Sequence, residues 1–212
     1  MDDRSLMPIS MEEQHDMHRK NLTLSFAAML LTACLYYRGG FVLLPVAALP
    51  ILAHELSHIL ALRLLGQRIT GFSLGGSGLC IRYDGSCTTA GHILAALAGP
   101  FGGAVYALAG LTGVEWLEQS AGLSLLLTAF NLLPLKPLDG GQVFYHVCVL
   151  TLGEIRGEEL CRAVSAVLLA LLLTGGVLLA VWKKSTAPLA AAIWLLLFQD
   201  EEQTLVNRGK IL

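Results

Sequence analysis

Residues 51–65 read ILAHELSHILALRLL, an apolar stretch that contains three ionisable side chains, His54, Glu55 and His58. Leu, Ile and Ala continue on both sides of the trio. Inside a membrane-spanning helix each such group costs on the order of 2.5–3.5 kcal/mol on insertion scales, so such groups are rare and usually functional. Three of them within five residues therefore require a compensating partner.

The composition of the whole chain indicates a membrane protein. Of its 212 residues, 55% are hydrophobic and 14% are charged, and the mean hydropathy is +0.65. Soluble domains carry about 25% charged residues, so this chain has too few polar side chains to cover a globule of its size. Its 14 Lys and Arg against 16 Asp and Glu also exclude a nucleic-acid-binding face. We expect an all-α polytopic membrane protein that is embedded in the lipid bilayer.

Uncharged runs predict about six transmembrane helices, because a span needs about 20 mostly apolar residues to cross ~30 Å of hydrocarbon. The last run is the shortest of the six. The predicted spans are residues 21–37, 39–62, 90–114, 119–135, 163–181 and 185–199. The flanking segments are a cytoplasmic N-terminal tail over 1–20 and a cytoplasmic C-terminal tail over 200–212.

The Lys and Arg residues predict the orientation in the cell membrane. With the N-terminus in the cytoplasm, eleven of the 14 fall on the inner side and three fall on the outer side. Such an excess on the inner side is the rule for multi-pass membrane proteins. We therefore expect a cytoplasmic N-terminus.

Residues 68–91, between the second and third spans, are rich in glycine. Ile69, Phe72 and Leu74 form a first apolar series, and residues 79–83 form a second one. This pattern is typical of a β-hairpin or sheet edge. An irregular glycine-rich loop is the alternative.

The spacing of the two histidines indicates a metal site. Positions i and i+4 lie on one face of a helix about one turn apart, so His54 and His58 can direct imidazole nitrogens at a common cation. Two His, one further ligand and an open position make a catalytic zinc site. Glu55, rotated about 100° around the axis, would face a water at the metal and act as a general base. A lone His is more often a satisfied core residue, and this interpretation is kept for His92 and His146.

Asp139 is the expected third ligand, because no other carboxylate lies between Glu118 and Glu154. The second and fourth predicted spans both run inward, and His58 lies about 10 Å from the inner end of its helix. The two sites can thus meet near the cytoplasmic third of the bilayer. An Asp-Gly turn at the membrane surface is the alternative.

The residues around this aspartate, NLLPLKPLDGG at 131–141, predict an interrupted helix. Pro134 and Pro137 break the helix, while Gly140 and Gly141 let the backbone turn. Broken backbone at membrane depth is tolerated only where it is buried in protein or lines a wet cavity.

HELSH at 54–58 in one transmembrane segment and NLLPLKPLDGG at 131–141 in a later one together resemble the site-2 protease family of intramembrane zinc metalloproteases. The size and span count are most similar to the bacterial sporulation branch, which processes a sigma-factor precursor. The resemblance covers about residues 41–141, the core of a six-span protease domain over 21–199. It implies one Zn²⁺ per chain, regulated intramembrane proteolysis of membrane-embedded or membrane-associated proteins, and an active site near the cytoplasmic side.

The resemblance also assigns roles to single residues. Asn131 resembles the family residue thought to position substrate or the oxyanion. Ser57 stands where the family usually has Gly, and we expect no loss because Ser is small. A separate regulatory protein is left open. The roles that carry over are zinc ligation by His54, His58 and Asp139 and acid/base catalysis by Glu55.

Hydrolysis inside hydrocarbon needs access for water and an unwound substrate. Ser57, Thr128 and Asn131 are expected to line a polar channel. Strand addition to the edge of the 69–83 hairpin would replace the main-chain hydrogen bonds that the substrate helix loses. The glycine-rich run at 97–103 is expected to allow close helix packing, with no catalytic part.

Two other function classes remain open on the sequence. The same ionisable groups could form a metal-cation transport site, because broken helices with intramembrane charges also occur in transporters. No second half repeats the pattern, which argues against a transporter. A catalytically inactive membrane scaffold is the third class, and the retained Glu55 argues against it.

Overall fold

The computed structural model describes residues 44–75, 78–84, 87–136, 138–183, 189, 192–193 and 195–196. Within these ranges the chain is mostly helical and contains one two-stranded sheet. The helices are Leu44–Leu64, α2 (Thr89–Ala107), the 3₁₀ helix η1 (Leu108–Thr112), α3 (Glu115–Asn131), α4 (Asp139–Leu152) and α5 (Glu154–Lys183).

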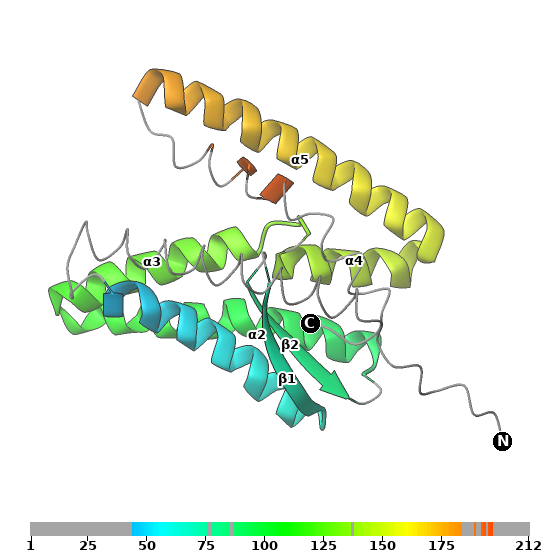
Figure 1. Ribbon diagram of the computed structural model, residues 1–212, viewed down its shortest axis with the longest axis horizontal. Coiled ribbons are helices and arrows are strands. Elements are labelled where there is room, and N and C mark those ends of the chain that lie inside the picture. Colours follow the sequence, from blue (N-terminus) through cyan, green and yellow to red (C-terminus); the bar gives the residue numbers. More distant parts are fainter. Residues whose placement is uncertain are drawn as a thin grey trace, which may run out of the picture.

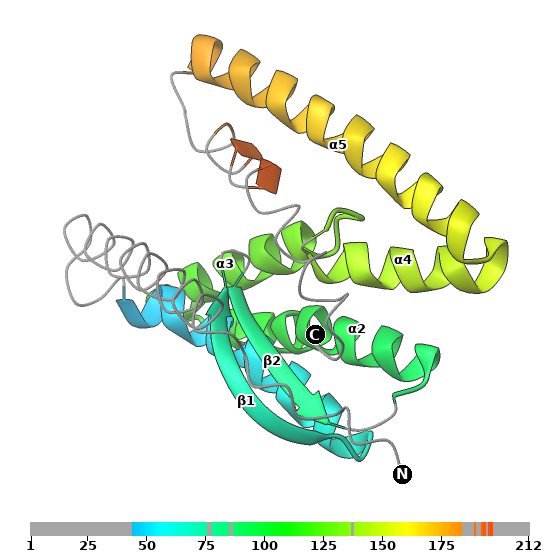
Figure 2. The ribbon, with the colours of Figure 1, turned by 45° about the vertical axis from the view of Figure 1, so that its right-hand side comes forward.

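The Leu44–Leu64 helix, α2 and α3 lie together at the centre of the described structure (Figure 1). The β-hairpin crosses the Leu44–Leu64 helix and α2 on one side, and α5 lies on the opposite side, where α4 leads into it (Figures 1 and 2). His54 and His58, on the Leu44–Leu64 helix, are both buried.

Three of the helices are long and apolar enough to cross a membrane: Leu44–Leu64, Thr89–Thr112 and Glu154–Trp182. They overlap the predicted second, third and fifth spans. α3 overlaps the predicted fourth span, but its 17 residues measure about 26 Å, which is short for a straight crossing. The predicted first span and most of the sixth lie outside the described residues, so the count of six stays a prediction.

The predicted hairpin is present. β1 (Arg68–Gly75) pairs antiparallel with β2 (Gly78–Asp84). The register shifts between Ile69 and Gly71, which marks a β-bulge. The bulge adds one residue to β1, so that Ile69, Phe72 and Leu74 pair with Tyr83, Ile81 and Leu79 and lie on one face of the hairpin. The two predicted apolar series therefore pair with each other, although Phe72 keeps 56% of its surface exposed.

One face of β2 anchors the hairpin to the helices. Ile81 and Tyr83 are buried against Leu62 of the Leu44–Leu64 helix and Ala95 of α2. The Tyr83 hydroxyl lies 3.0 Å from Nδ1 of His92. Burial, with a smaller contribution from a nearby thiol, raises the pKa of Tyr83 to about 12. The Tyr83 hydroxyl therefore stays protonated at physiological pH.

The helix break before the aspartate is also observed. α3 ends at Asn131, and α4, which is not among the predicted helices, begins at Asp139. Gly140 and Gly141 lie in the first turn of α4 and not in a turn between elements. A Cβ on Gly140 would lie 2.6 Å from the carbonyl oxygen of Leu133, and Gly141 is equally close to the connecting backbone. These glycines therefore permit close packing of the connection onto α4, whereas the sequence predicted that they let the chain turn.

A buried leucine cluster holds this connection in place. Leu135 and Leu138 pack with Leu169 of α5 and with Leu195, and each has at most 7% of its surface exposed. Leu138 directly precedes the aspartate at the start of α4. The packing of Leu138 against α5 thus helps to hold the carboxylate of Asp139 in position.

We expect Leu62→Ala to lower the free energy of unfolding by about 2–5 kcal/mol, because the fully buried side chain would leave a cavity between the hairpin and the helices. The control is Leu64→Ala, the same change two residues later at a side chain that is 79% exposed. Titration of the purified chain with SDS in mixed micelles, followed by circular dichroism, measures both. Equal midpoints for the two variants would contradict the packing described.

Candidate metal centre

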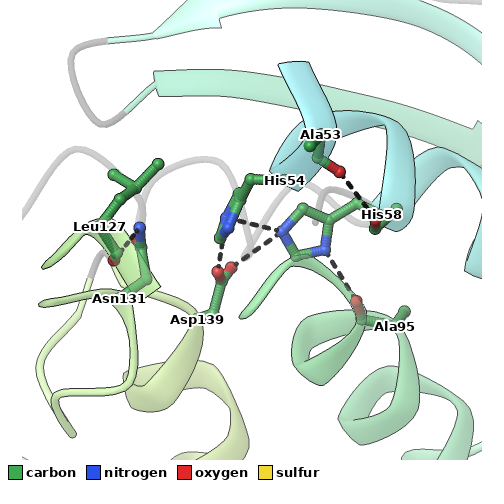
Figure 3. A network of polar contacts seen from close by, with 8 residues as sticks. Ala53, His54, His58, Ala95, Leu127, Asn131 and Asp139 are labelled. Carbon is green, nitrogen blue, oxygen red and sulfur yellow. Dashed lines mark hydrogen bonds and ion pairs between the residues drawn. The ribbon is translucent and has the colours of Figure 1, made fainter. Parts of the chain in front are cut away.

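The structure brings the three predicted metal ligands together (Figure 3). His54 and His58 lie on successive turns of the Leu44–Leu64 helix, and Asp139 is the first residue of α4. His54 Nε2 is 3.0 Å from one carboxylate oxygen of Asp139, and His58 Nε2 is 3.4 Å from the other. The two Nε2 atoms are 3.2 Å apart. Both imidazoles are buried, with 5% and 6% of their surfaces exposed.

The hydrogen bonds of His58 define its tautomer. Its Nδ1 lies 2.8 Å from the carbonyl oxygen of Ala95 on α2. A carbonyl oxygen can only accept, so Nδ1 carries the hydrogen and the neutral ring keeps a lone pair at Nε2. That lone pair faces a second imidazole nitrogen and a carboxylate. Three electron-rich groups in a buried site repel one another unless a cation lies between them.

The donor set fits a zinc ion. Two imidazole nitrogens and one carboxylate oxygen are the ligands of a known class of catalytic zinc sites. In a tetrahedral site with metal–ligand bonds of about 2.0–2.1 Å, the donors lie roughly 3.3 Å from one another. The two Nε2 atoms, 3.2 Å apart, match this spacing, and each lies at a similar distance, 3.0 or 3.4 Å, from one of the two carboxylate oxygens of Asp139. A fourth position is left for another ligand.

Gly99 of α2 forms one wall of this site. A Cβ at this position would lie 2.7 Å from His54 Nε2 and 2.6 Å from Cε1 of His58, so only glycine leaves the ligand position open. The expectation that the run at 97–103 serves helix packing alone is therefore incomplete. The glycine cluster itself was a signal, but the sequence does not say which neighbour each glycine meets.

The two predicted catalytic residues lie beside the ligands. Glu55 follows His54 in the same helix, is half-buried, and is close enough to interact electrostatically with the three ligands. Asn131 is half-buried at the end of α3, and its Nδ2 donates to the carbonyl of Leu127 at 3.0 Å (Figure 3). Nδ2 carries two hydrogens, so one remains for another acceptor. Their roles in catalysis stay predictions.

The other two residues of the predicted channel differ in their hydrogen bonding. Ser57 Oγ donates to the carbonyl of Ala53 at 2.7 Å, so its hydroxyl is engaged within its own helix. Its side chain fits because Gly102 lies opposite, where a Cβ would be 2.6 Å from the Ser57 Cβ. Thr128 is buried, and its Oγ1 has no hydrogen-bond partner in the described part of the chain.

The chain is similar to known proteins in sequence and in fold. The sequence profile of the peptidase M50B-like family matches residues 26–152, which include both motifs. Among solved structures, the chain is similar to a site-2 protease from Methanocaldococcus jannaschii, with 19% sequence identity and a TM-score of 0.63, over 87% of this chain and 88% of that one. At this identity the likeness shows a shared fold. No curated protein matches the chain.

We expect Gly99→Ala to weaken zinc binding by at least about 10–100-fold, the range seen when groups around metal ligands are displaced, because the added methyl group would displace both imidazoles. Gly122→Ala on α3 is the matched control, since a Cβ there meets nothing within 4 Å. Competition with a chelator, using the purified chain in detergent, measures both affinities. A wild-type affinity in Gly99→Ala would show that α2 does not form a wall of the site.

Proposed function

The chain belongs to the peptidase M50B-like family of metallopeptidases, and from this premise we propose that it is an intramembrane zinc metalloprotease of the site-2 type. Its substrates are membrane-embedded or membrane-associated proteins. The observation that carries the proposal is the buried convergence of His54, His58 and Asp139. These residues would hold one zinc ion per chain. The three membrane-spanning candidates support a site within the bilayer.

The residues around the ligands have separable roles in this proposal. A bound zinc ion would supply Lewis acidity, which polarises a carbonyl group and makes water more acidic. Glu55 takes a proton from the attacking water and returns it to the leaving amine. Asn131 donates its second Nδ2 hydrogen to the oxyanion that develops on the scissile carbonyl. The apolar surroundings strengthen the interactions of Glu55 with the attacking water and of Asn131 with the oxyanion, because little water screens them.

The hairpin is the proposed site of substrate binding. Within the described chain β1 and β2 pair only with each other, so each has an open edge. Because exposed sheet edges are usually protected against pairing with other chains, an open edge here indicates a place where another strand can bind. Through Ile81 and Tyr83 this sheet packs on the helix that carries His54. An unwound substrate segment that adds as a third strand would regain main-chain hydrogen bonds close to the metal.

The finer assignments rest on the sequence. The distribution of Lys and Arg supports a cytoplasmic N-terminus and an active site near the cytoplasmic side. The resemblance of the two motifs supports regulated intramembrane proteolysis and the sporulation branch that processes a sigma-factor precursor. Co-expression with candidate single-span substrates tests the regulated proteolysis and the assignment to the sporulation branch.

We expect Glu55→Gln to retain zinc and to lower the cleavage rate of a reconstituted single-span substrate by more than about 100-fold, because the variant keeps the ligands and loses the general base. Zinc content by mass spectrometry and cleavage by gel electrophoresis are measured on one preparation. Unchanged cleavage would falsify the role of Glu55.

The same preparation separates the alternatives. Zinc flux into liposomes without proteolysis by the wild type would favour a transporter. Neither flux nor proteolysis, with zinc still bound, would favour an inactive scaffold.

We expect Asp139→Asn to lower zinc affinity beyond the roughly 10–100-fold loss typical of residues that only support ligands, because the change removes the negative charge between the two imidazoles. Glu118→Gln, a carboxylate change at an exposed position on α3, is the control. An Asp139→Asn variant with wild-type zinc affinity would rule out this residue as the third ligand.

A further inference from the structure

One buried face of α3 carries three hydroxyl side chains at four-residue intervals, Ser120, Ser124 and Thr128. Ser120 donates to the carbonyl of Val46 at 2.9 Å, and Ser124 donates to the carbonyl of Gly103 at 2.7 Å. Thr128 is 9% exposed. Its Oγ1 meets no hydrogen-bonding atom among the described residues, so it is the exception in this series.

Thr128 also differs from hydroxyls elsewhere in the chain. A Ser or Thr in an apolar helix ordinarily donates to the carbonyl four residues earlier. Thr128 makes no such bond, and a buried hydroxyl without any partner is unfavourable. Its orientation therefore indicates a partner on another element. Helical hydroxyls that do bond backward are Ser57 to Ala53, Thr151 to Val147 and Thr174 to Ala170.

His54 contains a second buried atom without a partner. If its Nε2 is to ligate a metal, the hydrogen must lie on Nδ1. Metal-ligating histidines almost always donate this hydrogen to an acceptor that fixes the ring. For His58 the acceptor is the carbonyl of Ala95. For Nδ1 of His54, no acceptor occurs in the part of the chain that the structure describes.

Both atoms belong to side chains that contact the same stripe of α2. A Cβ on Gly99 would lie 2.7 Å from Nε2 of His54, and one on Gly103 would lie 2.5 Å from Oγ1 of Thr128. Positions four residues apart on a helix are separated by about 6 Å. Two hydrogen bonds through one water molecule span roughly 5–6 Å. The His54 and Thr128 side chains thus contact positions about one helical turn apart along α2, a separation that one water molecule can bridge.

We propose that Thr128 is a positioning residue for His54. One buried water molecule accepts the Nδ1 hydrogen of His54 and donates to Oγ1 of Thr128. This bridge fixes the tautomer and holds Nε2 toward Asp139. The inference rests on the proposed metalloprotease function, because it requires His54 to be a metal ligand.

Thr128→Val, which removes the hydroxyl and keeps the shape, tests the bridge. We expect the zinc affinity of the full-length chain in detergent to fall about 10–100-fold, the usual effect of removing a group that orients a ligand. Thr128→Ser restores a hydroxyl and should bind zinc like the wild type. Ser124→Ala removes a hydroxyl that is bonded to Gly103, and it should leave zinc affinity unchanged.

A second measurement separates orientation from packing. With Co²⁺ in place of zinc, the visible ligand-field bands should shift in Thr128→Val and not in Ser124→Ala. Wild-type affinity and spectrum in Thr128→Val would overturn the inference, as would equal losses in Thr128→Val and Ser124→Ala. His54→Ala separates a failure of the proposed function from a failure of the bridge. If His54→Ala keeps wild-type zinc affinity, the metal site itself is wrong. If His54→Ala loses zinc affinity and Thr128→Val does not, only the bridge is wrong.

Discussion

The structure depends on one electrostatic constraint. Two imidazole nitrogens and a carboxylate lie within 4.8 Å of one another in a buried site, and this arrangement is favourable only with positive charge between them. The neighbouring elements serve that constraint in different ways. The carbonyl of Ala95 orients one ring, Gly99 leaves space, and the start of α4 supplies the negative charge. The three side chains come from elements that lie far apart in the sequence, and a bound cation would join those elements.

The members of the His54, His58 and Asp139 cluster could be predicted because the pattern that points to each is local. His54 and His58 share a helix face by spacing alone, and Asp139 was the only carboxylate in its region. The hairpin followed from its alternating apolar residues. Such features depend on residue type and period, which a sequence states directly. The convergence of the three side chains then follows from helices that meet at similar depth.

The features that could not be predicted all depend on distances between elements. Gly99 and Gly140 are glycine because a neighbouring ring or carbonyl comes too close for a Cβ, and no local pattern encodes that neighbour. Ile69 and Phe72 share a face of the hairpin only because of a bulge whose position is not apparent in the sequence. α4 follows a broken segment, and an aspartate there is typical both of a helix N-terminus and of a turn, so the sequence does not distinguish the two. Close helix contacts in a membrane need small residues, but the presence of a small residue does not identify the element that packs against it.

The leucine cluster around Leu169 has a consequence for biosynthesis. Leu135 and Leu138 reach their buried positions only when α5 covers them, and α5 is made after every other part of the centre. A nascent chain that has inserted only the Leu44–Leu64 helix and α2 therefore possesses two of the three predicted ligands, His54 and His58. The three ligands therefore reach their final arrangement only after α5 has been synthesised.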